Sequence, residues 1–272
     1  MSAALAQIRA FLDASPQAAV VEIIEAKGST PREVATWMLV SPQSIYGTIG
    51  GGQLEYMAID RAREMLVSGE AIAKMDIPLG PEIGQCCGGR VRLDIAVLDD
   101  ELRAAMPLRI EAEEALQPHV YIFGAGHVGH AIAAAMALLP LTVTVVETRP
   151  DELEDIAQGV NRLAVALPEE VVTDAPPGSA FLVLTHDHAL DFLIAAAALN
   201  RGDAAYVGMI GSKTKKATFR NWFLKEAQGD EAVLAHLVCP IGGSDVKDKR
   251  PAVIAALAAA EVMRGLSATA RE

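Results

Sequence analysis

Apolar and polar residues follow two different patterns along the chain, and the change falls near residue 118. From residue 119 on, short apolar runs alternate with longer stretches of helical periodicity. Strand and helix in turn predict a parallel sheet covered on both faces, so we expect a Rossmann-like domain over residues 119–272. The predicted strands are HVYIFG, LTVTVVE, NRLAVAL, AFLVLTH and AAYVGMI, and the predicted helices cover about 127–139, 191–200, 214–227 and 252–264.

The first part of the chain has a more mixed pattern, which predicts a small α+β domain over residues 1–105. Helical periodicity covers 3–14 and about 53–67, and the predicted strands are 18–26, 35–40, 71–79 and 91–98. The stretch from Asp99 to Pro118 is polar, charge-dense and closed by a proline. We therefore expect a partly helical linker at 106–118 between the two domains.

Composition narrows the function classes. The chain has 272 residues, of which 51% are hydrophobic and 21% charged, and this excludes a disordered chain. A net charge of −12 and 4% aromatic residues argue against nucleic acid or an anionic membrane surface as partner. Three cysteines make no disulfide framework, and the N-terminal residues lack the basic and apolar regions of a signal peptide. We expect a cytoplasmic protein with reduced thiols.

A glycine fingerprint, GAGHVG, follows the strand HVYIF and opens a helix. Gly124 permits the tight turn, Gly126 lets a pyrophosphate approach, and Gly129 allows the helix to pack closely on the strand. Glu147 ends the next strand, 18 residues beyond the last glycine, where an acid would bind a ribose 2′-hydroxyl. His127 is expected to place an imidazole over the cleft. The fingerprint leaves open whether the loop binds NAD, holds another phosphate or merely turns.

Two further glycine loops precede helices. Gly50, Gly51 and Gly52 can leave several N–H groups pointing into one concavity, which is an anion nest, although a flexible turn explains them equally well. Gly211, Ser212 and Lys213 follow a strand and open a helix, and Lys215 and Lys216 add to a local basic cluster. That position favours a phosphate contact over a merely solvated helix start.

The segment GQCCGG places two thiols in an open loop of Gln85, Cys86, Cys87 and Gly88. Thiolates are soft ligands and sulfur carriers, so this loop suits a soft metal centre or a sulfur-transfer step. Core packing and a strained vicinal disulfide are the alternatives. The third cysteine, Cys239, is interpreted as a packed residue.

The segment THDH ends the predicted strand AFLVLTH, with Asp191 following. His186 and His188 stand one residue apart, which on a strand end would turn both imidazoles to one side, with Asp187 in reach. This arrangement predicts either a metal site or an acid/base group, and the alternative is a polar strand end without chemistry.

Taken together, these motifs resemble the XdhC family, the accessory proteins of xanthine dehydrogenase. The matching segments run over almost the whole chain, although Glu147 stands where an aspartate is expected and the segment after residue 242 is a looser match. They are GSTPR (28–32), GTIGGGQLE (47–55), GQCCGG (84–89), FGAGHVG (123–129), THDH with Asp191, YVGMIGSK (206–213) and CPIG (239–242).

The resemblance implies an accessory protein rather than an enzyme. Such a protein binds molybdenum cofactor (molybdopterin) received from the cofactor's biosynthesis proteins and holds it while a NifS-like cysteine desulfurase exchanges an oxo ligand for sulfur. It then passes the cofactor to the molybdenum subunit of apo-xanthine dehydrogenase, and a homodimer is expected. The glycine loops and the THDH segment would bind the cofactor, with Cys86 and Cys87 as metal ligands.

Two other functions stay open on the residues alone. One is an NAD-dependent oxidoreductase that uses the fingerprint and Glu147, with His127, His186 or His188 as proton donor. The other is a redox sensor that uses Cys86 and Cys87.

Overall fold

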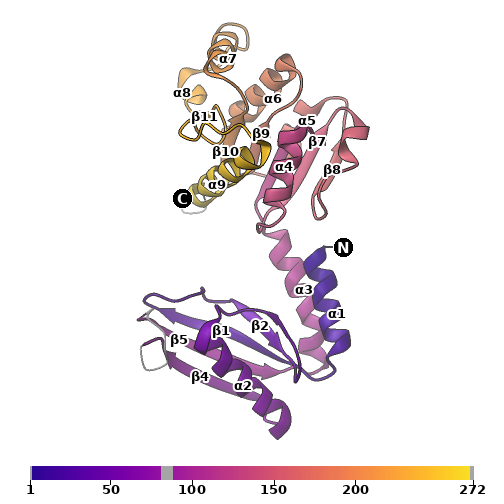
Figure 1. The fold of residues 1–272 in the computed structure, drawn as a ribbon, viewed down its shortest axis with the longest axis vertical. Helices are drawn as coiled ribbons and strands as arrows, with labels where there is room; N and C mark the ends of the chain where they lie inside the picture. The colour runs from indigo at the N-terminus through magenta and orange to yellow at the C-terminus, as the bar shows by residue number, and fades with distance from the viewer. Residues whose placement is uncertain (1, 81–87, 270–272) are drawn as a thin grey trace. The chain divides into compact units, whose positions relative to one another are not determined.

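The computed structural model describes residues 2–80 and 88–269. The chain divides into two compact units, an N-terminal unit over Met1–Ala112 and a C-terminal unit over Glu113–Glu272 (Figure 1). Each has its own sheet and its own hydrophobic clusters.

In the described part of the N-terminal unit, five antiparallel strands form one sheet in the order β3-β2-β1-β5-β4. Helices lie on both faces, which confirms the predicted α+β fold. The elements are α1 (Ala3–Ala14), β1 (Ala19–Lys27), β2 (Trp37–Val40), β3 (Ile45–Gly47), α2 (Gly52–Ser68), β4 (Ile72–Pro78), β5 (Arg90–Val97) and α3 (Asp100–Ala115).

Strand β1 shows how the sequence builds both faces of this sheet. Successive side chains in a strand point to opposite faces. Val21 and Ile23 accordingly join the cluster that packs on α2, and Val20 joins the cluster that packs on α1 and α3.

Residues 106–115 of the expected, partly helical linker form the second half of α3. Met106 and Ile110 stand four residues apart, so they lie on one face of the helix, and both are buried against the α1 side of the sheet. Arg103 of the same helix donates to the carbonyl oxygens of Leu12 and Ser15 at 2.8 and 2.7 Å. The many charged residues of this segment made its narrow apolar face hard to recognise in the sequence.

In the described part of the C-terminal unit, six parallel strands form a sheet in the order β11-β10-β9-β6-β7-β8. Counted along the chain from β6, this is the doubly wound Rossmann order, and the prediction is confirmed. The direction of winding reverses between β6 and β9. The strands are β6 (His119–Phe123), β7 (Thr142–Glu147), β8 (Asn161–Ala164), β9 (Ala180–Val183), β10 (Tyr206–Met209) and β11 (Leu237–Val238).

Helices cover both faces of this parallel sheet, as the two buried clusters show. One cluster joins it to α4 and α9, and the other to α5, α6, α7 and α8. The helices are α4 (His127–Met136), η2 (Pro150–Leu153), α5 (Pro168–Asp174), α6 (His188–Asn200), α7 (Lys213–Lys225), α8 (Glu231–Leu234) and α9 (Pro251–Thr269). By length and composition α9 is long and apolar enough to cross a membrane, yet Ala258 and Val262 are fully buried in the first cluster.

The strands of this unit are shorter than their apolar runs predicted. β8 ends at Ala164 and β9 at Val183, because the chain beyond each strand turns toward the next helix. The short elements β3, β11, α5 and α8 were not expected, since segments of two to seven residues are too short to show a periodicity.

Candidate functional site

The fingerprint loop lies where the winding of the parallel sheet reverses. Gly124 has a φ of +114°, and a Cβ there would lie 2.4 Å from the carbonyl oxygen of Leu184, at the end of β9. A Cβ at Gly129 would lie 2.1 Å from the carbonyl oxygen of Gly124. Gly126 differs, because a Cβ there would meet no atom within 4 Å. Packing therefore requires the first and third glycines, whereas the second faces open space at the start of α4, where a phosphate would approach.

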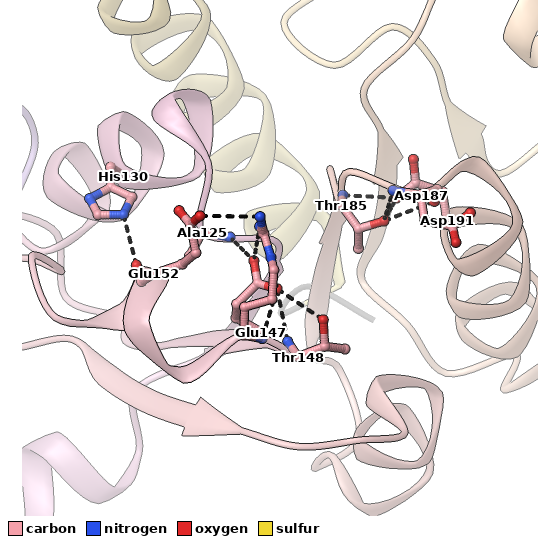
Figure 2. Close-up of polar contacts among 9 residues, drawn as sticks. Ala125, His130, Glu147, Thr148, Glu152, Thr185, Asp187 and Asp191 are labelled. Atoms are coloured by element: carbon pink, nitrogen blue, oxygen red, sulfur yellow. Dashed lines mark hydrogen bonds and ion pairs between the residues drawn. The ribbon is translucent and has the colours of Figure 1, made fainter.

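Glu147 at the end of β7 is buried and turns into this loop (Figure 2). Its Oε2 accepts from the amide of Ala125 at 2.9 Å and from Nη2 of Arg149 at 3.0 Å. Its Oε1 accepts from the amide and the hydroxyl of Thr148 and from the amide and Nε of Arg149. Burial alone raises the pKa of a carboxyl, but the bonds from Arg149, Ala125 and Thr148 outweigh burial and hold the pKa of Glu147 at about 2.

These contacts do not fit the ribose contact predicted for Glu147. An ionised carboxylate has about four lone-pair positions, and six donors already share them. Arg149, which the sequence analysis missed, also pairs with Glu152 at 3.1 Å. In the sequence, Arg149 could have been recognised as a partner of Glu147 only from its position two residues further along the chain.

A second buried carboxylate, Asp191 of α6, braces the loop after β9 (Figure 2). Its Oδ1 accepts from the amide and the hydroxyl of Thr185, both at 2.8 Å. Its Oδ2 pairs with Nζ of Lys215 from α7, whose side chain is 9% exposed. Asp191 therefore ties the loop after β9 to the start of α7, the helix that follows β10.

The THDH segment lies beyond the strand rather than on it. His186 is in the loop, Asp187 is the N-cap of α6 and accepts from the amide of Ala189, and His188 is the first helical residue. All three are exposed. Within residues 2–80 and 88–269, no three His, Cys, Asp or Glu side chains gather as metal ligands would. The structure thus gives the metal interpretation of this segment no geometric support.

The lysines after β10 do not form the basic cluster that their spacing predicts. Lys215 is paired with Asp191 and Lys216 donates to the carbonyl oxygen of Leu237 at 3.3 Å, while Lys213 is exposed at the start of α7. Ser212 caps α7 by accepting from the amide of Lys215. Gly211 lies under the Lys215 side chain, where a Cβ would come within 2.8 Å of Cδ.

One edge of the parallel sheet therefore carries most of the predicted residues of this unit. We call it the carboxyl edge, and its exposed or half-exposed members are Gly126, His127, Arg149, His186, Asp187, His188, Ser212 and Lys213. Two buried carboxylates, Glu147 and Asp191, fix its loops by accepting hydrogen bonds from the backbone amides of Ala125 and Thr185.

In the N-terminal unit the three glycines proposed as an anion nest or a flexible turn form a left-handed turn, and a carboxylate of the chain itself accepts from amides there. Gly50, Gly51 and Gly52 have φ values of +122°, +72° and +66°. Oε2 of Glu55, in the first turn of α2, accepts from the amides of Ile49 and Gly51 at 3.0 and 3.1 Å and from the hydroxyl of Thr48. The sequence analysis assigned no role to Glu55, although an acid in a helix's first turn is the usual partner of such amides.

Three of the motifs in this unit converge around the nest. A Cβ at Gly89 would lie 2.3 Å from the carbonyl oxygen of Ser29, so GQCCGG ends against GSTPR. A Cβ at Gly50 would lie 2.7 Å from Pro31, so GSTPR also lies against GTIGGG. Gly88, exposed with a φ of +69°, donates to the carbonyl oxygen of Leu79 at 2.8 Å. Gln85, Cys86 and Cys87 lie outside the described residues, and their roles stay predictions.

The CPIG motif has a packing role in the C-terminal unit. Oε2 of Glu261 accepts from the hydroxyl of Tyr206 at 2.7 Å and from the amide of Gly242 at 2.8 Å, which fixes the motif on α9. Cys239 is half-buried and packs on the hydrophobic cluster around α6 and α7. Burial raises the pKa of its thiol, which fits its interpretation as a packed residue.

Two protein-family models match this chain. The sequence model of the XdhC Rossmann domain matches residues 120–262, and that of the XdhC and CoxI family matches residues 11–76. The uncharacterized protein YqeB of Escherichia coli (strain K12) is 26% identical over 262 residues, which are 90% of this chain but only 43% of that protein.

A solved structure described as a xanthine dehydrogenase from Bacillus halodurans shares the fold, with a TM-score of 0.80 and 17% sequence identity. The likeness covers 98% of this chain and 96% of that one. Since the Rossmann match alone spans more than half of the sequence, the resemblance is confirmed and the chain belongs to the XdhC family.

Proposed function

We propose that this protein is a maturation factor of xanthine dehydrogenase that binds molybdenum cofactor, holds it during sulfuration by a cysteine desulfurase, and delivers it to the apoenzyme. The observation that carries the proposal is the convergence of GSTPR, GTIGGG and the end of GQCCGG in the N-terminal unit of an XdhC-family chain. The thiol Cys87 directly precedes Gly88, which belongs to that convergence.

The carboxyl edge fits the phosphate of such a cofactor. Gly126 is open to solvent at the N-terminus of α4, where amide groups and the helix dipole favour an anion. His127 and Lys213 are exposed on the same edge. The glycine nest of the N-terminal unit fits a phosphate less well as it stands, because the Glu55 carboxylate already accepts from the amide of Gly51 and from that of the neighbouring Ile49.

Oxidoreduction with NAD is the competing function, and the Rossmann order with its fingerprint is the observation in its favour. The saturated carboxylate of Glu147 counts against it, since NAD needs an acceptor for its adenosine ribose at that strand end.

Cofactor retention tests the proposal directly. The full chain, purified from a host that makes molybdenum cofactor, is analysed for molybdenum and for pterin fluorescence after oxidation. We expect the wild type to retain both, and the double variant Cys86→Ser, Cys87→Ser to lose molybdenum while it stays folded.

Cys239→Ser is the matched control, because it removes a thiol that packs in the other unit. Equal molybdenum content in the double variant, the control and the wild type would exclude the two thiols as ligands. A wild type without any pterin would contradict the proposed function itself.

A further inference from the structure

We propose that Glu147 is a positioning residue of the fingerprint loop. We propose also that it excludes an adenosine ribose from the carboxyl edge, because its two carboxylate oxygens already accept from six donors of the chain. The inference rests on the proposed function and narrows its ligand class: the edge takes a phosphate ester that places no ribose hydroxyl at the end of β7. NAD, which the fold family suggests, is then not a ligand of this chain.

The positioning role follows from the bond between Oε2 of Glu147 and the amide of Ala125. Ala125 is 1% exposed and stands between Gly124, which is wedged against Leu184, and Gly126, which faces open space. The carboxylate therefore holds the one loop residue that links the packed glycine to the open glycine. A charged acceptor makes this bond stronger than a neutral one would.

The exclusion follows from the other contacts. The amide and the hydroxyl of Thr148 and the amide and Nε of Arg149 share Oε1, and Nη2 of Arg149 takes the second position on Oε2. A ribose hydroxyl that donates to Glu147 must displace one of these donors. Among these donors the Arg149 guanidinium is the one that solvent reaches most easily, because the Arg149 side chain is 42% exposed. An ion pair with Glu152 keeps it in place.

Glu152 is fixed in turn. Its backbone carbonyl lies 3.1 Å from Nε2 of His130 in α4 (Figure 2). Its side chain pairs with Nη1 of Arg149. The three charged side chains thus form a closed set at the end of β7, with two negative charges and one positive. Such a set is a poor place for a second, 2′-linked phosphate as well, because the net charge there is negative.

The test uses the full chain and two probes that do not involve molybdenum. The first probe is NAD binding, measured by calorimetric titration of the wild type and of Arg149→Ala, with Arg220→Ala as control. Arg220 is also an exposed arginine paired with one acid, Glu231, so the control removes the same charge elsewhere in the unit. The second probe is amide hydrogen exchange at Ala125 in Glu147→Ala.

We expect the wild type and Arg220→Ala to bind NAD with a Kd no better than about 1 mM. Arg149→Ala leaves Oε2 of Glu147 with only the Ala125 amide, so it should bind NAD at least about tenfold more tightly. Exchange at Ala125 should rise by about tenfold or more in Glu147→Ala, because the amide loses a charged acceptor.

Micromolar binding of NAD to the wild type, lost in Glu147→Gln, would overturn the inference, and so would an Arg149→Ala variant no better than the wild type. Unchanged exchange at Ala125 in a folded Glu147→Ala would do the same. If Glu147→Ala does not fold, the Arg149→Ala titration decides alone. A wild type that retains no molybdopterin sinks the proposed function and leaves both of these readouts intact.

Discussion

A Cβ on Gly129 would lie 2.1 Å from the carbonyl oxygen of Gly124, so the first turn of α4 crosses directly over the end of β6. The glycine between them, Gly126, has free space around its Cβ position. The fingerprint therefore contains two glycines that packing requires, Gly124 and Gly129. At the third, Gly126, a Cβ would meet no atom of the described residues. That difference makes the loop a good place to separate folding from binding.

We expect Gly129→Ala to lower the free energy of unfolding by about 3 kcal/mol, because backbone must move to admit the methyl group. Gly126→Ala should cost about 1 kcal/mol or less, the usual effect of losing a glycine N-cap, since its φ of −75° suits alanine. Molybdopterin content should fall in Gly126→Ala even though it folds. Denaturant unfolding and pterin fluorescence measure the two effects, and a Gly126→Ala variant with full cofactor content would place the phosphate elsewhere.

The pH dependence of stability should carry a contribution from Glu147. Its pKa is held at about 2 in the folded protein against an ordinary 4.5, so the folded state prefers the ionised form. This contributes about 3 kcal/mol, present in full above about pH 5 and lost as the pH falls toward 2. Unfolding measured at pH 7 and pH 3 should show a smaller difference for Glu147→Gln than for the wild type. Parallel curves would contradict the shifted pKa.

The buried pair of Asp191 and Lys215 should be costly to break from either side. Asp191→Asn or Lys215→Met leaves one charge without its partner in a buried place, so each should lower stability by about 3–5 kcal/mol. The double variant should recover part of that loss. The exposed pair of Arg220 and Glu231 is the control, with an expected effect of about 0–1 kcal/mol. Additive losses in the double variant would mean that the two side chains do not interact.

Glu55 should stabilise the glycine nest. Glu55→Ala removes the acceptor of the Ile49 and Gly51 amides, and the expected loss is about 1–3 kcal/mol. Glu64→Ala on the exposed side of the same helix should change stability by less than about 0.5 kcal/mol. Thermal unfolding of the two variants gives the comparison, and equal melting temperatures would show that water replaces Glu55 at no cost.

The architecture could be predicted from the sequence because it depends on local periodicity. Alternation along β1 and strand–helix alternation after residue 118 each encode which faces are buried, and the predicted fold class is confirmed, although the short edge strands β3 and β11 were not expected. Where the sequence did not predict an element, the reason is also a local one. In α3 the apolar stripe is reduced to residues such as Met106 and Ile110, too few to stand out among the surrounding charges.

The sequence indicated which loops lie at the strand ends of the C-terminal unit, but not which side chains contact one another there. The fingerprint indicated Gly126 as the glycine that a phosphate could approach, and that role stays a prediction, although the space around its Cβ position is open. The contacts of Glu147, Lys215 and the glycine nest depend on side chains from other parts of the chain, which the local sequence does not reveal. Asp191 and Lys215 are 24 residues apart and meet only because β9 and β10 are neighbours in the sheet. No spacing rule along the chain contains that information.

The carboxylate of Glu55 has a consequence for any anion that enters the glycine nest. The side chain is tethered to the first turn of α2, so it competes at a high effective concentration that does not fall on dilution. A small free anion offers only its own charge against this competitor, whereas a large ligand with contacts on the neighbouring GSTPR and GQCCGG loops brings several at once. We therefore expect inorganic phosphate alone to bind the nest too weakly to be detected, and a larger anionic ligand to compete better with Glu55.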